Sequence, residues 1–162
     1  MSDYIKMMHL DENDSRILDI LQVDGRAPAS HIAGEIGMSV PAVGERIKKL
    51  VDSGIIRQFK AVVDPRKVGL DVAALITVIS ESSANYEKVT ENAQNTVEIK
   101  ECYSTTGRGS HVMLIHTKNT ASLEMLLRKI QSWPGVEHTE TQLILSSYKK
   151  LSTIHITKIS GD

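Results

Sequence analysis

The chain has 162 residues, enough for one medium domain or two small ones, and its 41% hydrophobic content is ordinary for a globular protein. No stretch approaches the roughly 18 consecutive apolar residues of a membrane helix, and residues 1–4 lack the basic-then-apolar layout of a signal peptide. The single cysteine, Cys102, excludes an internal disulfide framework. We therefore predict a cytoplasmic protein with no membrane partner.

The net charge is −1, from 19 basic and 20 acidic residues. Proteins that coat nucleic acid without sequence preference rely on a broad basic surface, so this balance argues against that class. Any contact with DNA would have to come from a local basic patch, which oligomerisation would then multiply.

Three helices are predicted in the first 54 residues. Asp11 is a candidate N-cap of the first helix, Pro28 and Gly37 bracket a short second one, and Ser39 caps a third that Gly54 ends. Apolar residues recur at spacings of one, three and four, which is typical of helices with one buried face. These residues are Ile17, Leu18, Ile20 and Leu21, then Ile32, Ala33 and Ile36, then Val40, Val43, Ile47 and Leu50.

The pattern changes after Gly54. Residues 55–63 are rich in β-branched and aromatic side chains and are predicted to form a strand that connects two domains. Residues 72–80 are continuously apolar, so we expect that strand to be buried on both faces. Further strands are predicted at 97–105, 111–117, 136–147 and 151–159, with helices at 86–93 and 123–130.

From residue 70 onward the order β-α-β-β-α-β is that of a ferredoxin-like split βαβ unit. The predicted fold class is therefore α+β, with an N-terminal three-helix, winged-type helix-turn-helix joined to a C-terminal ferredoxin-like domain. The expected domains are residues 1–54, a connecting strand and linker at 55–69, and residues 70–162.

The third helix, residues 40–53, carries the residues that point to a function. Opposite its apolar stripe lies an outer face on which small residues come first and basic residues follow. Between residues 39 and 60, five basic and two acidic side chains give a local charge of +3. A tight turn followed by such a helix suits a reader of the DNA major groove. The candidate DNA-binding residues are Ser39, Pro41, Ala42, Glu45, Arg46, Lys48 and Lys49.

Each residue type in this set suggests a role. Pro41 and Ala42 would lie nearest the bases, and Glu45 could accept a hydrogen bond from a cytosine amino group. Lys48 and Lys49 would mainly contact phosphates. The alternative is a solvated surface helix, since a charged outer face is the rule for amphipathic helices. The short preceding helix and its glycine turn favour DNA binding.

Several segments resemble the Lrp/AsnC family, the leucine-responsive and asparagine-synthesis regulators. The most specific block runs from Ile36 to Ile56: Ile-Gly-Met-Ser-Val-Pro-Ala-Val, then Glu-Arg-Ile-x-x-Leu-x-x-x-Gly-Ile-Ile. The resemblance covers roughly residues 10–147. It implies a regulator of transcription that binds double-stranded DNA in the nucleoid, with a C-terminal domain that mediates homodimerisation and commonly senses amino acids. A tetramer or octamer is the expected larger assembly.

The chain departs from this family after Gly107. Members that sense amino acids usually carry an acidic residue next and often another two positions later, where this chain has Arg108 and Ser110. A guanidinium repels an ammonium group but can hold a carboxylate through two parallel hydrogen bonds. Arg108 could equally be a solvated hairpin residue. The candidate effector-binding residues, for an amino acid or related carboxylate, are Gly107, Arg108, Gly109, Ser110, Thr139 and Thr141.

Two other functions stay open. The missing acidic pair would suit an effector-independent architectural protein that wraps DNA. A small-molecule-binding module or an enzyme would need convergent reactive groups on the ferredoxin-like half, and we predict none. Ser110 and His111 are neighbours on a predicted strand, so their side chains should point to opposite faces. Neither a dinucleotide motif nor a metal-ligand spacing is present, so no cofactor or metal is predicted.

Overall fold

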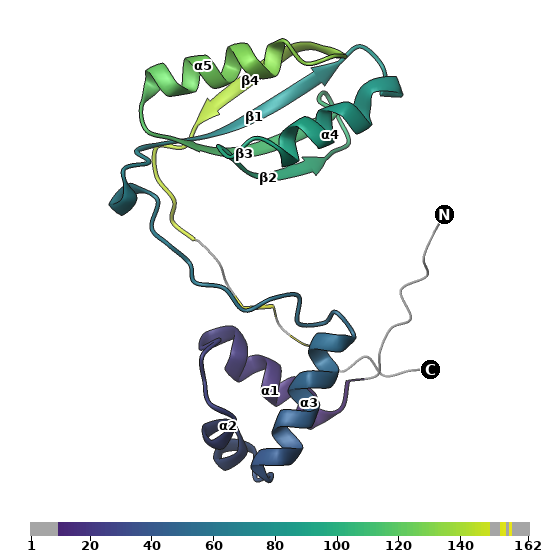
Figure 1. Cartoon of the computed structure of the whole chain (residues 1–162), viewed down its shortest axis with the longest axis vertical. Coiled ribbons are helices and arrows are strands. Elements are labelled where there is room, and N and C mark those ends of the chain that lie inside the picture. Colours follow the sequence, from purple (N-terminus) through teal and green to yellow (C-terminus); the bar gives the residue numbers. More distant parts are fainter. Residues whose placement is uncertain (1–9, 150–152, 155, 157–162) are drawn as a thin grey trace. The chain divides into compact units, whose positions relative to one another are not determined.

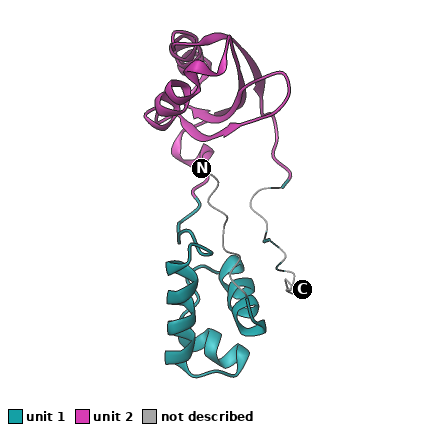
Figure 2. Ribbon diagram, turned by 90° about the vertical axis from the view of Figure 1, so that its right-hand side faces the viewer, with its two compact units in different colours: residues 1–62, 149–162 teal, residues 63–148 magenta. Residues whose placement is uncertain are grey.

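The structure is a computed structural model that describes residues 10–149, 153, 154 and 156. The chain forms two compact units (Figures 1 and 2). Residues 1–62 and 149–162 make the helix-turn-helix unit, and residues 63–148 make the sheet unit. The expected second domain, 70–162, differs from this division at its C-terminal end, because Ile156 packs against the core of the helix-turn-helix unit.

Helix starts and stops in the helix-turn-helix unit follow the signals in the sequence. The Asp11 side chain accepts a hydrogen bond from the Asp14 backbone in a capping box, and the Ser39 side chain accepts one from Ala42. Gly37 and Gly54, with φ of 72° and 76°, adopt the left-handed conformation that favours glycine at helix ends. The helices are α1 (Glu12–Val23), α2 (Ala29–Ile36) and α3 (Val40–Asp52).

The sheet unit is a four-stranded antiparallel sheet in the order β2-β3-β1-β4, with both helices on one of its faces (Figure 2). This is the predicted ferredoxin-like arrangement, and the predicted α+β class is confirmed. Short 3-10 turns precede β1 and α4. The elements are β1 (Val72–Ser80), α4 (Tyr86–Gln94), β2 (Ile99–Ser104), β3 (His111–Thr117), α5 (Thr120–Gln131) and β4 (Val136–Leu143).

Some of the predicted strands are wrong or too long. Residues 55–63 form no strand, β2 begins at Ile99, and β4 ends at Leu143. Of the predicted strand 151–159, the described residues 153, 154 and 156 lie outside any strand, and the other six lie outside the described residues. A strand needs a neighbour to complete its hydrogen bonds, and a run of β-branched residues cannot supply that neighbour.

The prediction that β1 is buried on both faces is also wrong for the single chain. Ala74, Ile76 and Val78 are completely buried beneath the helices, whereas the alternating Leu75 and Thr77 are half-buried. The reason is that α4 and α5 cover only one face of the sheet (Figure 1). On the second face of β1, Leu75 and Thr77 are therefore half-buried, and no second layer of helices or strands in the described sheet unit covers them.

Candidate DNA-binding helix and effector loop

The predicted outer face of α3 is exposed. Pro41, Glu45, Lys48 and Lys49 are all exposed, and Ala42 is half-buried. On the opposite side, Val43 and Leu50 are completely buried and join the core that α3 shares with α1 and α2. This core fixes the rotation of α3, so that the small and basic residues point away from the unit.

Gly44 belongs to the same outer face and was missed by the sequence analysis. It is exposed, and a Cβ added to it would meet nothing within 4 Å. Glycine inside a helix costs roughly 0.5–1 kcal/mol relative to alanine, so a glycine with no packing reason is an unexplained cost. That cost is the signal that could have identified it. Gly44 widens the small-residue part of the face between Pro41 and Lys48.

Arg46 lies at the edge of α3 and makes contacts within the unit. Its Nη1 atom is 2.7 Å from both Asp11 Oδ2 and Asp14 Oδ1. The Asp14 backbone N–H, which donates to Asp11, lowers the pKa of the Asp11 carboxyl, and Arg46 reinforces this effect. Hydrogen bonds to Asp14 and Asp11 in turn raise the pKa of Arg46. The ion pairs of the Arg46 guanidinium therefore link α3 to the beginning of α1.

The candidate effector loop, residues 105–110, connects β2 to β3 and lies against β1. A Cβ on Gly109 would be 2.2 Å from Thr77 Cγ2, so only glycine permits this close approach. The Ser110 backbone N–H donates to the Val78 carbonyl at 2.9 Å. Arg108 is 79% exposed at its side chain, and its Nη2 atom lies 3.0 Å from Glu140 Oε1 of β4. The loop thus presents a guanidinium paired with a carboxylate.

The structure places Arg108 on one face of the sheet, and Thr139 and Thr141 of the predicted effector residues on the other. Thr139 pairs in register with Val78 and accepts a hydrogen bond from Gln131 of α5, which places it on the helix-covered face. Thr141 projects to the same face, since alternate residues of a strand do so. Glu140 lies opposite Thr77 and projects to the other face with Arg108. Sequence reasoning missed Glu140, because its nearness to Arg108 depends on the pairing of distant strands.

The prediction that Ser110 and His111 point apart is wrong. Ser110 Oγ lies 2.9 Å from His111 Nδ1 and 2.7 Å from Ser80 Oγ. Ser110 precedes the first residue of β3, so the strand alternation does not yet apply to it. His111 is only 1% exposed, and the edge contact with Tyr86 has a ring separation of 5.0 Å. Burial lowers the pKa of His111. Both residues of the pair are buried among the residues that the structure describes.

Two family models match this chain. Residues 10–57 match a winged helix-turn-helix DNA-binding model, and residues 71–154 match the Lrp/AsnC ligand binding domain. The chain belongs to the Lrp/AsnC family of transcriptional regulators. The resemblance seen in the sequence is thereby confirmed, and the regulator is a DNA-binding protein with a ligand-binding domain.

Curated relatives agree with this assignment over nearly their whole length. The chain is 42% identical over 147 residues to the HTH-type transcriptional regulator FL11 of Pyrococcus abyssi, covering 91% of this chain and 97% of the relative. It is 34% identical over 142 residues to the regulatory protein AsnC of Haemophilus influenzae, covering 87% and 95%. These relatives are regulators of transcription and not enzymes, as predicted for this chain.

Solved structures show the same fold. The structure of Escherichia coli AsnC matches with a TM-score of 0.82 at 27% identity, covering 88% of this chain and 97% of that one. A Neisseria meningitidis transcriptional regulator, solved as a complex with L-Met, matches with a TM-score of 0.84 at 24% identity, covering 90% and 96%. Within the part of this regulator that the structure describes, no helix is long and apolar enough to cross a membrane.

Proposed function

We propose that this regulator binds double-stranded DNA by placing the outer face of α3 in the major groove, as a dimer or larger homo-oligomer. The observation that carries the proposal is the outer row of small and then basic residues on α3, opposite the completely buried Val43 and Leu50; Val40 and Ile47 of the predicted apolar stripe are exposed and half-buried. Small residues permit close approach to base edges, and basic residues neutralise phosphates.

The residues of α3 divide into contacting and positioning residues. Pro41, Ala42 and Glu45 would lie nearest the bases, and Lys48 and Lys49 would contact the sugar-phosphate backbone. Ser39 and Arg46 were also predicted to contact DNA. Their bonds within the unit, to Ala42 and to the two aspartates of α1, support positioning roles for both side chains.

The charge of the chain and the open face of the sheet both support the proposed dimerisation. A local charge of +3 in a chain of net charge −1 is a weak site by itself, so two copies of α3 on one DNA would strengthen it. The half-buried face of β1, with Leu75 and Thr77, offers a surface that a second copy could cover. Two α3 helices would then read half-sites about one helical turn apart. A tetramer or octamer and a cytoplasmic, nucleoid-associated location stay predictions.

For the effector we propose an amino acid or a related carboxylate at the Arg108 side of the loop. Arg108 and Glu140, 3.0 Å apart, carry the two charges complementary to a zwitterion. Arg108 would hold the ligand carboxylate, and Glu140 would hold its ammonium group in place of the missing acidic residues. The alternative is an architectural protein that wraps DNA without an effector, for which the exposed Arg108–Glu140 pair would be only a surface ion pair.

Two experiments test this function. Selection from a random duplex library, followed by footprinting, should yield a short protected site with two half-sites about ten base pairs apart. Uniform protection without a preferred site would favour the architectural alternative. A thermal-shift screen against the twenty amino acids should then raise the melting temperature of the wild type, but not of Arg108→Ala, since a ligand stabilises the state it binds.

A further inference from the structure

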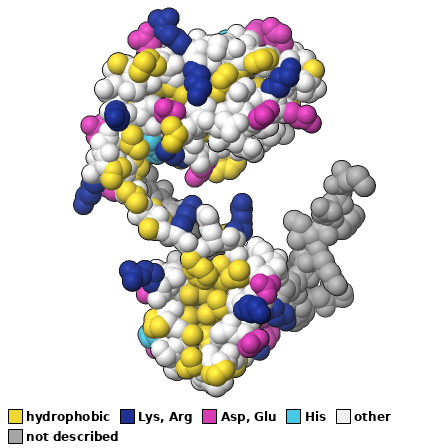
Figure 3. Space-filling model, viewed as in Figure 1, with side chains coloured by type: hydrophobic (Ala, Val, Ile, Leu, Met, Phe, Trp, Pro, Cys, Tyr) yellow, Lys and Arg dark blue, Asp and Glu magenta, His cyan; other side chains and the backbone are white. Residues whose placement is uncertain are grey.

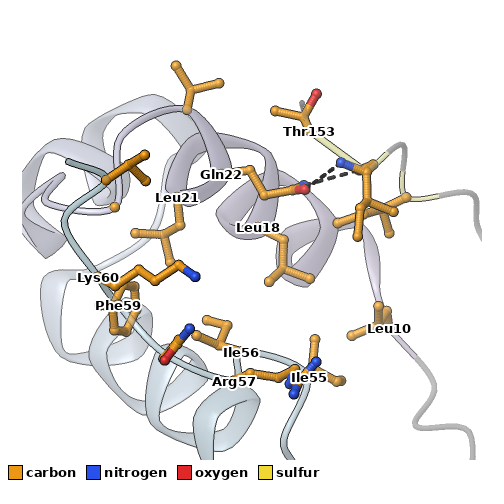
Figure 4. A pocket seen from close by; sticks show the side chains of 16 residues that line it. Leu10, Leu18, Leu21, Gln22, Ile55, Ile56, Arg57, Phe59, Lys60 and Thr153 are labelled. Carbon is orange, nitrogen blue, oxygen red and sulfur yellow. Dashed lines mark hydrogen bonds between the residues drawn. The ribbon is translucent and has the colours of Figure 1, made fainter. Parts of the chain in front are cut away.

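The C-terminal segment contributes to the helix-turn-helix unit. Residues 153, 154 and 156 line an open groove of about 810 Å³ together with α1 and the segment that follows α3. Hydrophobic side chains gather on this unit in Figure 3. In Figure 4, Leu18 and Leu21 of α1 face Ile56 and Phe59 across the groove. The groove is therefore a largely apolar surface built from α1, the segment after α3 and the described C-terminal residues.

Gln22 attaches the C-terminal segment to this groove. Its side-chain Nε2 donates to the Ile154 carbonyl at 3.1 Å, and the Ile154 backbone N–H donates to Gln22 Oε1 at 2.6 Å (Figure 4). A side-chain amide that hydrogen-bonds to both the N–H and the carbonyl of one residue satisfies the same backbone groups that a neighbouring strand would satisfy. It can hold an extended segment whatever the side chain of that residue is.

An apolar contact accompanies these hydrogen bonds. Ile156 is half-buried and packs against the core of the helix-turn-helix unit, whereas Ile154 is 76% exposed. The segment is thus bound to α1 through the backbone of Ile154 and to the core through the side chain of Ile156.

Both walls of the groove are connected to α3. Arg46 of α3 bonds to the capping box of α1, which forms one wall. In the other wall, the Ile56 backbone N–H donates to the Leu50 carbonyl in the last turn of α3, at 3.0 Å. A segment that binds α1 therefore contacts one of the elements that orient the recognition helix.

We infer that residues 153, 154 and 156 belong to a strap that docks on α1 and on the core of the helix-turn-helix unit, and that docking of the strap sets the DNA affinity of α3. The strap follows β4 in the sequence, so the DNA-binding unit is joined covalently to the sheet unit at residues 62–63 and again at 148–149. The effect on DNA affinity rests on the proposed function.

The test uses the full chain and three substitutions of exposed glutamines. Gln22→Ala removes both hydrogen bonds to Ile154. Gln22→Glu keeps an acceptor for the Ile154 N–H but loses the donor to its carbonyl. Gln94→Ala, on α4 of the sheet unit, is the matched control. The measurements are hydrogen exchange of the Ile154 amide and binding of a labelled mixed-sequence duplex at fixed low salt.

In the wild type we expect the Ile154 amide to be protected from exchange. Gln22→Ala should speed its exchange about tenfold or more and weaken duplex binding several-fold, with Gln22→Glu between the two, because an undocked amide exchanges freely. Gln94→Ala should change neither quantity. A second variant, Ile156→Asp, leaves α1 untouched and should reproduce the effect of Gln22→Ala.

Three results, each distinguishable from the others, would contradict parts of this proposal. Equal exchange of Ile154 in the wild type and in Gln22→Ala would exclude the docked strap. Faster exchange with unchanged duplex binding would exclude control of α3 by the strap. A wild type that binds no duplex at all would overturn the proposed function, and Ile154 exchange would still decide whether the strap docks.

Discussion

The helix-turn-helix unit and the sheet unit of this regulator are specified in different ways. In the first, caps, glycine stops and three-four spacing lie within residues 11–54 and determine three helices locally. In the second, β1 is completed by partners far away in the sequence, as Ala74 pairs with Ile115 and with Leu143. Local signals therefore predict the helices of the first unit well, whereas predicted strands fail or are too long in both units.

The same contrast applies to the functional residues. The DNA-facing residues share one helix, so their common face follows from helical geometry. The effector candidates come from a loop and a strand whose pairing is non-local, and the structure separates Arg108 from Thr139 and Thr141. A face on one element can be read from spacing, whereas a site made by several elements cannot.

The largest expected effect concerns DNA binding by α3. Lys48→Ala combined with Lys49→Ala should weaken binding to every duplex about tenfold or more at low salt, because each lysine neutralises a phosphate. The slope of log affinity against log salt should fall by about 1.8 for each bound subunit, at about 0.9 per lost phosphate contact. Binding titrations at several salt concentrations measure both quantities.

The matched control for this experiment is Lys88→Ala with Lys129→Ala on the exposed surface of the sheet unit. These changes should leave the slope unaltered. Arg46→Ala should chiefly lower the melting temperature, since it leaves the Asp14 carboxylate, with a side chain only 7% exposed, without its cation. An unchanged slope in the α3 double variant would refute the assignment of Lys48 and Lys49 to phosphate contacts.

A smaller effect is expected from Gly109→Ala in the sheet unit. The added methyl carbon would lie 2.2 Å from Thr77 Cγ2 and 3.1 Å from the Val78 carbonyl oxygen. Forcing that group into a packed site should cost about 1–3 kcal/mol of unfolding free energy. Urea unfolding followed by the fluorescence of Trp133, the only tryptophan and a buried residue of the sheet unit, measures this loss. Full stability in this variant would contradict the close seating of the loop on β1.

Gly44→Ala in the helix-turn-helix unit should have the opposite sign. Because an added Cβ meets nothing within 4 Å, alanine should stabilise the unit by about 0.5–1 kcal/mol while weakening DNA binding several-fold. Gly34→Ala on α2, where space is equally open, is the control and should stabilise without affecting DNA binding. If both variants bind DNA equally well, Gly44 does not face the DNA.

The smallest effect is a difference in pH response between the units. Burial lowers the pKa of His111 from its ordinary 6.5, so the unfolded state takes up a proton first and the sheet unit loses stability as pH falls below 6.5. The loss levels off below the folded pKa. The pKa of Asp11 is lowered from 3.8, so its contribution to the helix-turn-helix unit persists until the pH falls below that value.

Unfolding at pH 7.5 and 5.5 checks this difference. Trp133 fluorescence should report a lower unfolding free energy of the sheet unit at pH 5.5 than at pH 7.5. His111→Gln should remove that part of the pH dependence. An unfolding free energy of the sheet unit that is the same at both pH values would show that protonation of His111 does not change its stability.

The sequence by itself determined the two-part α+β fold, the three N-terminal helices with their caps, and the outer face of α3. It also placed the strands 72–80 and 111–117 correctly. Each of these depends on signals within a few residues of one another, namely a capping side chain, a glycine stop or a periodic apolar stripe.

Only the tertiary structure decided which groups those elements bring together. It turned Arg46 toward Asp11 and Asp14, brought Glu140 beside Arg108, and docked the C-terminal segment on Gln22. These partners lie 32 to 132 residues apart in the sequence. The spacing of residues in the sequence does not predict such pairs, because these residues meet only when the apolar faces of distant elements pack together.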